Sequence, residues 1–180
     1  MNKKIFFAFI ILILLPIESF AQLEFSIGGY AGGGSIKGNS PSEGSFGTSV
    51  FIETNIPLFE EVFPRLSFIY ARDFSALLPD SRQTYLPYVQ GFSFKGVTSQ
   101  YFDSKIFLEE AVGALILNDR TFSDTDSWEY GVVLSFAGGF DLRNYNLKGF
   151  KIGAGVEYGL TFTGTLPQYF NLHLQFQYTL

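Results

Sequence analysis

The C-terminal stretch from Gln168 to Leu180 alternates apolar and polar residues without a break. Its apolar positions are Phe170, Leu172, Leu174, Phe176, Tyr178 and Leu180, and its polar positions are Asn171, His173, Gln175, Gln177 and Thr179. Because successive side chains of a β-strand point to opposite faces, this pattern predicts a strand with one apolar and one polar face. The alternation is about twice as long as an ordinary strand, and a tilted strand of that length can cross the hydrocarbon core of a bilayer.

Similar alternating stretches recur between turn residues along the rest of the chain. They predict seven further strands, at Leu23–Gly33, Phe46–Ile56, Arg65–Phe74, Tyr85–Thr98, Lys105–Leu117, Trp128–Asp141 and Gly149–Phe162. Pro87 removes one hydrogen-bond donor near the start of the fourth of these. The pattern therefore predicts an all-β fold, an eight-stranded antiparallel up-and-down β-barrel, whose even strand count returns both chain ends to one side. No helix, linker or second domain is expected after the N-terminal segment.

The composition of the two faces indicates which one points outward. The polar face is mostly Gly, Ser, Thr, Gln and Asn, whereas a face exposed to water normally carries many charged side chains. The apolar face is rich in Phe and Tyr, as is the lipid-facing wall of a membrane barrel, and the chain is only 16% charged but 18% aromatic. We therefore predict a transmembrane barrel. The alternative is a soluble periplasmic, lipocalin-like ligand-binding barrel with its apolar face inside.

Residues 1–21 have the pattern of a cleavable secretory signal peptide, which leaves 22–180 as the barrel domain. A positively charged end precedes an apolar run from Ile5 to Leu15, which is too short for a membrane-spanning helix. Small residues then stand three positions and one position before the end of this segment. This arrangement predicts cleavage between Ala21 and Gln22.

The chain has no cysteine and a formal net charge of −5. The first property excludes a disulfide framework and a thiolate metal site, and the second provides no basic surface for nucleic acid. Asp119, Asp124 and Asp126 cluster in one predicted loop at 118–127, but their spacing fails the EF-hand pattern because Trp128 stands at a ligand position. We predict a solvated loop there, and neither a metal nor a cofactor.

The terminal strand ends with Phe176, Tyr178 and Leu180, an apolar last residue with an aromatic residue two positions before it. In this ending and in its alternating strands, the chain resembles the small bacterial outer-membrane β-barrels, the OmpA-transmembrane-like or OmpX-like barrels often described as porin-like. The resemblance implies a location in the outer membrane of a Gram-negative bacterium, in contact with its lipid and lipopolysaccharide. It also implies that periplasmic chaperones and the barrel assembly machinery handle the chain, and that this machinery reads the terminal strand.

Charged and polar residues on the polar faces are expected to line the lumen. They are Glu24, Glu53, Asp73, Lys95, Glu129, Asp141, Lys151, Glu157, His173 and Gln175. In a narrow interior of low dielectric these groups should pair with one another, either as a structural network that plugs the barrel or as a small ion path. One of Glu109 and Glu110 also belongs to the lumen, but their strand is apolar on both faces toward its end and the pattern does not decide which.

His173 is the only histidine, and it lies on the face predicted to line the lumen. It could serve as the general base of a lipid A-modifying deacylase or acyltransferase, since outer-membrane enzymes of these classes are small barrels. The resemblance is incomplete, because those deacylases carry Ser two residues after the His and this chain has Gln175. No nucleophile or acid stands beside His173 in the sequence. We therefore expect a structural or adhesive barrel, or a very narrow pore, without catalysis, and retain the enzyme as the alternative.

Overall fold

The computed structural model describes residues 24–78, 84–103 and 105–180. The predicted signal peptide and its cleavage site at Ala21 and Gln22 lie outside these residues. In the described parts of the chain, no helix has the length and hydropathy needed to span a membrane.

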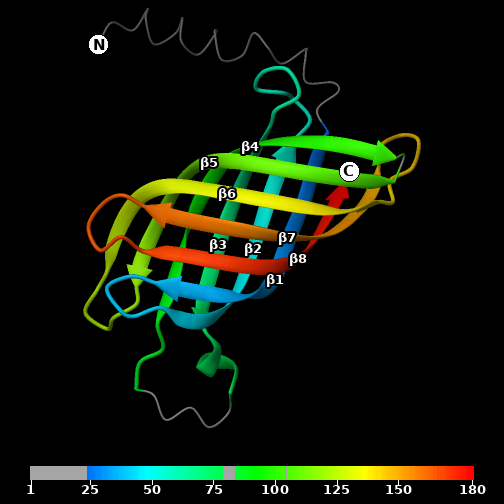
Figure 1. The fold of residues 1–180 in the computed structure, drawn as a ribbon. Helices are drawn as coiled ribbons and strands as arrows, with labels where there is room; N and C mark the ends of the chain where they lie inside the picture. Colours follow the sequence, from blue (N-terminus) through cyan, green and yellow to red (C-terminus); the bar gives the residue numbers. More distant parts are fainter. Residues whose placement is uncertain (1–23, 79–83, 104) are drawn as a thin grey trace, which may run out of the picture.

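Eight antiparallel strands form one closed barrel, in which each strand pairs with its neighbours in the sequence and β1 pairs with β8 (Figure 1). The strands are β1 (Phe25–Lys37), β2 (Glu43–Thr54), β3 (Phe63–Asp73), β4 (Tyr88–Asp103), β5 (Ile106–Arg120), β6 (Ser127–Asp141), β7 (Gly149–Thr161) and β8 (Gln168–Thr179). The predicted all-β, up-and-down architecture with eight strands is confirmed.

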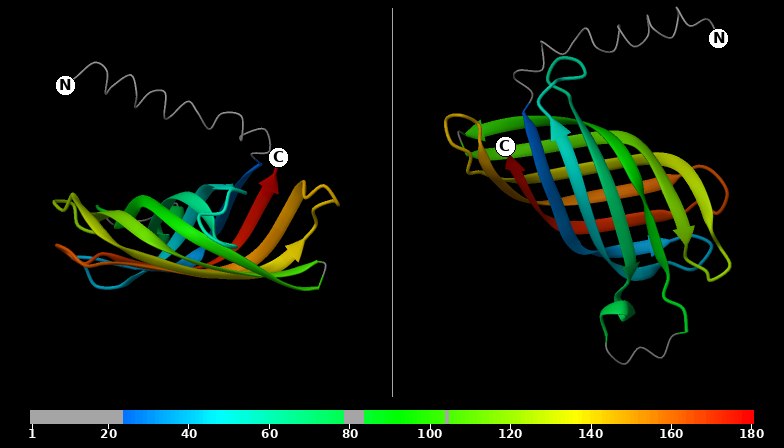
Figure 2. Two further views of the ribbon diagram at one scale, coloured as in Figure 1. Left: turned by 90° about the horizontal axis from the view of Figure 1, so that it is seen from above. Right: turned by 180° about the vertical axis from the view of Figure 1, so that it is seen from behind.

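The chain enters and leaves the barrel at the same end, where the amide of Leu180 donates a hydrogen bond of 3.0 Å to the carbonyl of Phe25. The turns at 55–62 and 142–148 lie at this end, which we call the turn end (Figures 1 and 2). The hairpin loops at 38–42, 121–126 and 162–167 lie at the other end, which we call the loop end. The loop end also carries η2 (Phe74–Leu77), a single turn of 3-10 helix where the sequence predicted none.

Side chains alternate between the two faces of each strand, and the apolar set points outward. In β8, Phe170, Leu172, Leu174 and Phe176 are between 39% and 60% exposed. The polar residues between them are buried in the lumen. The barrel is therefore apolar on its outer wall, opposite to the arrangement of a lipocalin-like barrel.

Several strands are longer than the sequence pattern predicted. β1 continues to Lys37, β4 to Asp103 and β5 to Arg120, so the turn predicted at 99–104 is mostly strand and the loop predicted at 118–127 begins later. The segment between the predicted strands Leu23–Gly33 and Phe46–Ile56 shortens for the same reason, to residues 38–42. Ladder hydrogen bonds join backbone groups, so pairing continues through residues whose side chains favour turns.

Proline sets the start of β4. The predicted start at Tyr85 is wrong, because Pro87 has no N–H to donate and the regular ladder begins only at Tyr88. The carbonyl of Pro87 still accepts a hydrogen bond of 2.9 Å from the amide of Asp73. β3 ends at Asp73, where its carboxylate accepts a hydrogen bond from the amide of Ser75 and caps η2.

Glycine permits closure where β1 meets β8. A Cβ atom at Gly32 would overlap the backbone carbonyl of Leu172 in the facing strand. The two strands approach this closely because the small barrel is strongly curved. Gly29, Gly32 and Gly34 therefore serve the packing of backbone against backbone, whereas Gly28 and Gly33 leave room for the rings of Phe51 and Phe74.

Candidate functional site: the barrel interior

Buried charges gather in the interior of the barrel, and two ion-pair clusters occupy its centre. The first is the arginine cluster, centred on Arg65 of β3, which is 1% exposed. Its Nη2 donates to Glu53 Oε2 at 2.5 Å, and its Nη1 donates to Glu109 Oε1 at 2.6 Å. Gln175 and Gln177 donate to the same two carboxylates at 3.3 and 3.1 Å. One guanidinium thus forms ion pairs with two carboxylates from different strands.

The arginine cluster decides between the two neighbouring glutamates of β5. Glu109 points into the lumen and bonds Arg65, whereas Glu110 points outward and is exposed. Arg65 was not among the lumen residues predicted from the sequence. Its position one residue before the outward Leu66 was a usable signal, because alternation places it inward.

The second group is the lysine cluster, in which Glu157 of β7 accepts three hydrogen bonds. Lys95 Nζ donates to its Oε2 at 2.6 Å, and the hydroxyls of Tyr30 and Tyr169 donate to its Oε1 at 2.6 and 2.7 Å. Both charged side chains are almost fully buried. The buried carboxylate of Glu157 thus accepts hydrogen bonds at both of its oxygens, from one cation and two phenol hydroxyls, which compensates for its loss of water. Arg65 and Lys95 are register partners, so the two clusters are adjacent.

His173 lies inside the barrel, beside the lysine cluster. Its ring stacks on Tyr30 with 4.0 Å between the ring centroids and 19° between their planes. It is 6% exposed, and its Nδ1 has no hydrogen-bond partner within the described residues. The only histidine therefore packs against an aromatic ring in the lumen, away from the outer wall where a lipid substrate would lie.

A cavity lined mostly by polar and charged residues opens at the turn end. Its volume is 910 Å³, within the range of about 300–1,000 Å³ that is typical of ligand sites. We call it the vestibule. Glu24, Glu53, Asp141 and Lys151 are among the residues that line it. Lys151 is buried, and its ammonium lies 4.8 Å from the ring centroid of Phe107. Charged side chains therefore form the inner end of the vestibule.

Asp141 and Arg143 form an ion pair of 2.6 Å at the rim of the vestibule. Burial alone would lower the pKa of Arg143, but the hydrogen bonds and charge of Asp141 raise it above its ordinary value. The guanidinium also donates to the hydroxyl of Tyr101 at 2.9 Å. The side chains of the rim thus hold one another in place.

Besides Asp141, three predicted lumen residues lie near the ends of the barrel rather than at its centre. Glu24 is half-buried at the turn end. Asp73 lies at the loop end, where it caps η2. Glu129 also lies there and accepts hydrogen bonds from Ser127 and Thr163 at 2.9 and 2.5 Å.

An apolar plug fills the lumen toward the loop end, where the sequence analysis expected small polar side chains. It consists of Ile36, Ile69, Ala71, Val89, Leu115, Leu117, Val133 and Tyr169, all of them buried. The expectation was wrong because an interior position need not be polar when it is sealed from water. The apolar run on both faces of β5 was the sequence signal for this plug.

Asp119 closes the loop end above the apolar plug. Its side chain is 0% exposed and accepts hydrogen bonds from the amide and hydroxyl of Thr121 at 2.8 and 2.7 Å. The hydroxyl of Thr165 and the amide of Asn39 also donate to it. Asp119 thus joins three hairpins, and the predicted solvated loop is wrong for this residue. No group of acidic or histidine side chains in the described parts of the chain has the arrangement of a metal site.

Comparison with known proteins yields a likeness of fold. No protein-family profile matches the chain, and no curated protein sequence matches it. The structure is similar to that of Neisserial surface protein A (NspA), with a TM-score of 0.68 and 8% identity over 86% of this chain and 96% of that one. It is also similar to Ail, the attachment invasion locus protein of Yersinia pestis, with a TM-score of 0.52 and 15% identity over 88% of this chain and 99% of that one. Both likenesses support an eight-stranded barrel fold.

Proposed function

We propose that this chain is an outer-membrane β-barrel of a Gram-negative bacterium, with a structural or adhesive role and an interior that does not conduct ions. One observation carries the proposal: the wall is apolar outside, while charged pairs and an apolar plug fill the inside. A soluble barrel would need the reverse arrangement.

The dimensions and surface of the barrel support insertion into a membrane. The strands have 11 to 16 residues, and about 9 to 11 tilted residues suffice to cross a bilayer. Closure leaves no unpaired strand edge in hydrocarbon. Exposed aromatic residues near the barrel ends, such as Trp128 and Tyr178, fit the aromatic girdles of membrane barrels.

Two successive barriers in the lumen support the absence of conduction. An ion that entered the vestibule would meet the arginine and lysine clusters, whose charges are already paired. Beyond them, the side chains of the apolar plug offer no polar group to replace the hydration shell of the ion, apart from the hydroxyl of Tyr169, which is already bonded to Glu157. These two barriers therefore favour a non-conducting barrel over the very narrow pore that the sequence also allowed.

The comparison with Ail bears on the choice between a structural and an adhesive role. Ail was solved in complex with the heparin analogue sucrose octasulfate. A polyanion of this kind requires a basic surface, whereas this chain has a net charge of −5. If the chain is adhesive, we expect a partner that is not a polyanion.

The position of His173 argues against the alternative of a lipid A-modifying enzyme. A base that acts on lipid A has to reach the outer wall or a cavity that opens to it, and His173 is stacked on Tyr30 in the lumen. Mass spectrometry of lipid A from cells with and without the gene tests this alternative, and we expect identical profiles.

The proposed partners remain outer-membrane lipid and lipopolysaccharide, periplasmic chaperones, and the assembly machinery that would read Phe176, Tyr178 and Leu180.

The proposal predicts a barrel that fractionates with the outer membrane and resists extraction without detergent. On a gel, the unheated protein should migrate as a compact species and the boiled protein more slowly. In planar bilayers, the purified protein should show no stable conductance. Extraction by buffer alone would overturn the membrane location, and a large, stable conductance would overturn the sealed interior.

A further inference from the structure

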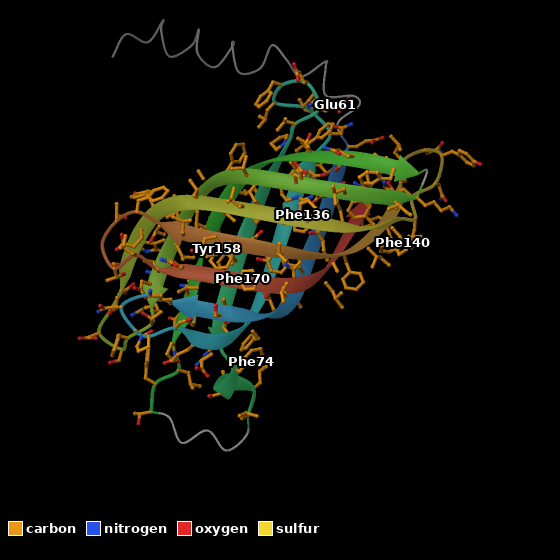
Figure 3. The ribbon with its side chains drawn as sticks, in the orientation of Figure 1. Glu61, Phe74, Phe136, Phe140, Tyr158 and Phe170 are labelled. Carbon is orange, nitrogen blue, oxygen red and sulfur yellow. The ribbon has the colours of Figure 1, made fainter. Side chains whose placement is uncertain are left out.

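The outer wall carries a groove that crosses β4 to β8 on the side near the turn at 55–62. Its volume is 770 Å³, within the range of about 300–1,000 Å³ that is typical of ligand sites. Small residues, including Gly96, Val112 and Ala114, lie between larger side chains such as Phe94 and Phe136. Figure 3 shows Phe136, Tyr158 and Phe170, all of which line the groove, over the near face of the barrel. The hollow therefore results from a local change in side-chain size on the outward face.

The turn at 55–62 folds against the wall and caps one end of this groove. Its own hydrogen bonds hold it together, from the amide of Leu58 to the carbonyl of Val62 at 2.7 Å and from the amide of Val62 to the carbonyl of Phe59 at 3.0 Å. The hydroxyl of Thr98 on β4 donates to the carbonyl of Glu61 at 3.1 Å and ties the turn to the wall. Leu58 and Phe59 line the groove from this turn, so the cap is preformed and apolar.

Glu110 places one carboxylate in this otherwise largely apolar groove. It points outward from β5, where its register partners are Thr98 and Phe136. Within the parts of the chain that the structure describes, no cationic side chain forms an ion pair with it. Because Thr98 is tied to the turn, Glu110 lies level with that turn and four residues from the turn-end start of β5 at Ile106. A carboxylate this close to the turn end of a membrane barrel lies within reach of lipid headgroups and calls for a cation.

We propose that this groove binds one phospholipid whose headgroup carries a primary ammonium, with an acyl chain along the apolar floor and the ammonium on Glu110. The groove spans four strand spacings, or about 19 Å, which suits an extended acyl chain. In a bilayer the acyl chain already lies in hydrocarbon, so each methylene contributes to binding through closer packing against the groove than against other lipid tails. The carboxylate supplies selectivity, because it attracts an ammonium and repels an anionic headgroup.

This inference rests on the proposed membrane location, and its test separates the two. The mature chain, in its folded and heat-modifiable form, is reconstituted into nanodiscs that contain equal amounts of phosphatidylethanolamine and phosphatidylglycerol with identical acyl chains. Lipids that remain bound after transfer to mild detergent are then identified by native mass spectrometry. A chain that fails to insert would overturn the membrane location, whereas an inserted chain that retains both lipids equally would overturn only the lipid site.

Variants with matched controls test the two parts of the site. We expect the wild-type protein to retain phosphatidylethanolamine over phosphatidylglycerol by about fivefold, the ratio that an exposed ion pair at the upper end of its usual strength supports. Glu110→Gln should abolish this preference. Glu60→Gln removes a carboxylate of the turn at 55–62 that does not line the groove, and it should keep the preference.

Ala114→Phe should fill the floor of the groove and lower the retention of both lipids. Ala154→Phe adds the same ring to the outward face of β7 outside the groove, so it should leave retention unchanged. An unchanged lipid preference in Glu110→Gln would overturn the proposal. So would a mass equal to two chains in place of one chain with lipid, because it would assign the groove to a second copy of the protein.

Discussion

At the scale of single residues, Arg65 is the side chain on which the interior depends most. It is 1% exposed, and its guanidinium is the cation bonded to both Glu53 and Glu109. Its aromatic neighbour Phe51 lies 4.2 Å from the guanidinium carbon, measured to the ring centroid. Removing the cation would leave two carboxylates facing each other in a medium of low dielectric, which is costly.

We therefore predict that Arg65→Leu lowers the free energy of unfolding by about 3–5 kcal/mol. The triple variant Arg65→Leu, Glu53→Gln, Glu109→Gln should recover most of this loss, because it also removes the uncompensated carboxylates. Urea unfolding in lipid vesicles, followed by the fluorescence of Trp128, measures both changes.

An exposed ion pair provides the control for this experiment. Arg120 and Asp126 lie 3.2 Å apart at the loop end, where solvent screens them. Arg120→Leu should cost about 1 kcal/mol or less. If Arg65→Leu cost no more than Arg120→Leu, the arginine cluster would not be a stabilising centre of the fold.

At the scale of elements, alternation predicted the strands well, because pairing and burial both follow a period of two. β8 and β7 were predicted to within one residue, since every second side chain in them is apolar. The ends of β4 and β5 were not, because ladder bonds continue into turn-prone residues and the sequence pattern does not record backbone pairing. The partners of each buried charge were also beyond prediction, since they come from strands far apart in the sequence. Glu157, for example, pairs with Lys95 and not with any residue of its own strand.

The seam between β1 and β8 gives a prediction about barrel closure. A side chain at Gly32 would overlap the carbonyl of Leu172, so Gly32→Val should prevent the two strands from pairing. The compact, heat-modifiable band should be lost. Ala31→Val adds the same side chain to the exposed outward face of the neighbouring residue and should keep that band. A compact band in Gly32→Val would mean that the seam can widen without cost.

The hairpin loops depend on one buried carboxylate. Asp119→Ala would leave donors of Asn39, Thr121 and Thr165 without their acceptor, at a cost of about 1–3 kcal/mol. Hydrogen exchange in the loops at 38–42, 121–126 and 162–167 should speed up by about tenfold or more. Asp124→Ala removes an exposed carboxylate of the same region and should leave exchange unchanged. Equal exchange in the two variants would contradict the role of Asp119.

At the scale of the whole molecule, the interior is open at one end and closed at the other. The vestibule admits water at the turn end. The ion-pair clusters lie between the vestibule and the apolar plug. The plug and Asp119 close the loop end. This asymmetry was not predicted, because a sequence pattern assigns residues to a face but does not give their depth along the barrel axis. Depth depends on strand tilt and stagger, which are properties of the closed sheet.

The absence of cysteine makes this asymmetry measurable. Ser99→Cys places a thiol in the vestibule, and Ala71→Cys places one in the apolar plug, where Ala71 is 3% exposed. In the folded barrel, a hydrophilic thiol reagent should modify Ser99→Cys at least about 100-fold faster than Ala71→Cys, because the plug must open before the reagent reaches the second thiol. In urea after boiling, both variants should react at the same rate, which shows that the difference comes from the fold. Equal rates in the folded protein would mean that water passes the plug, and the sealed interior would have to be abandoned.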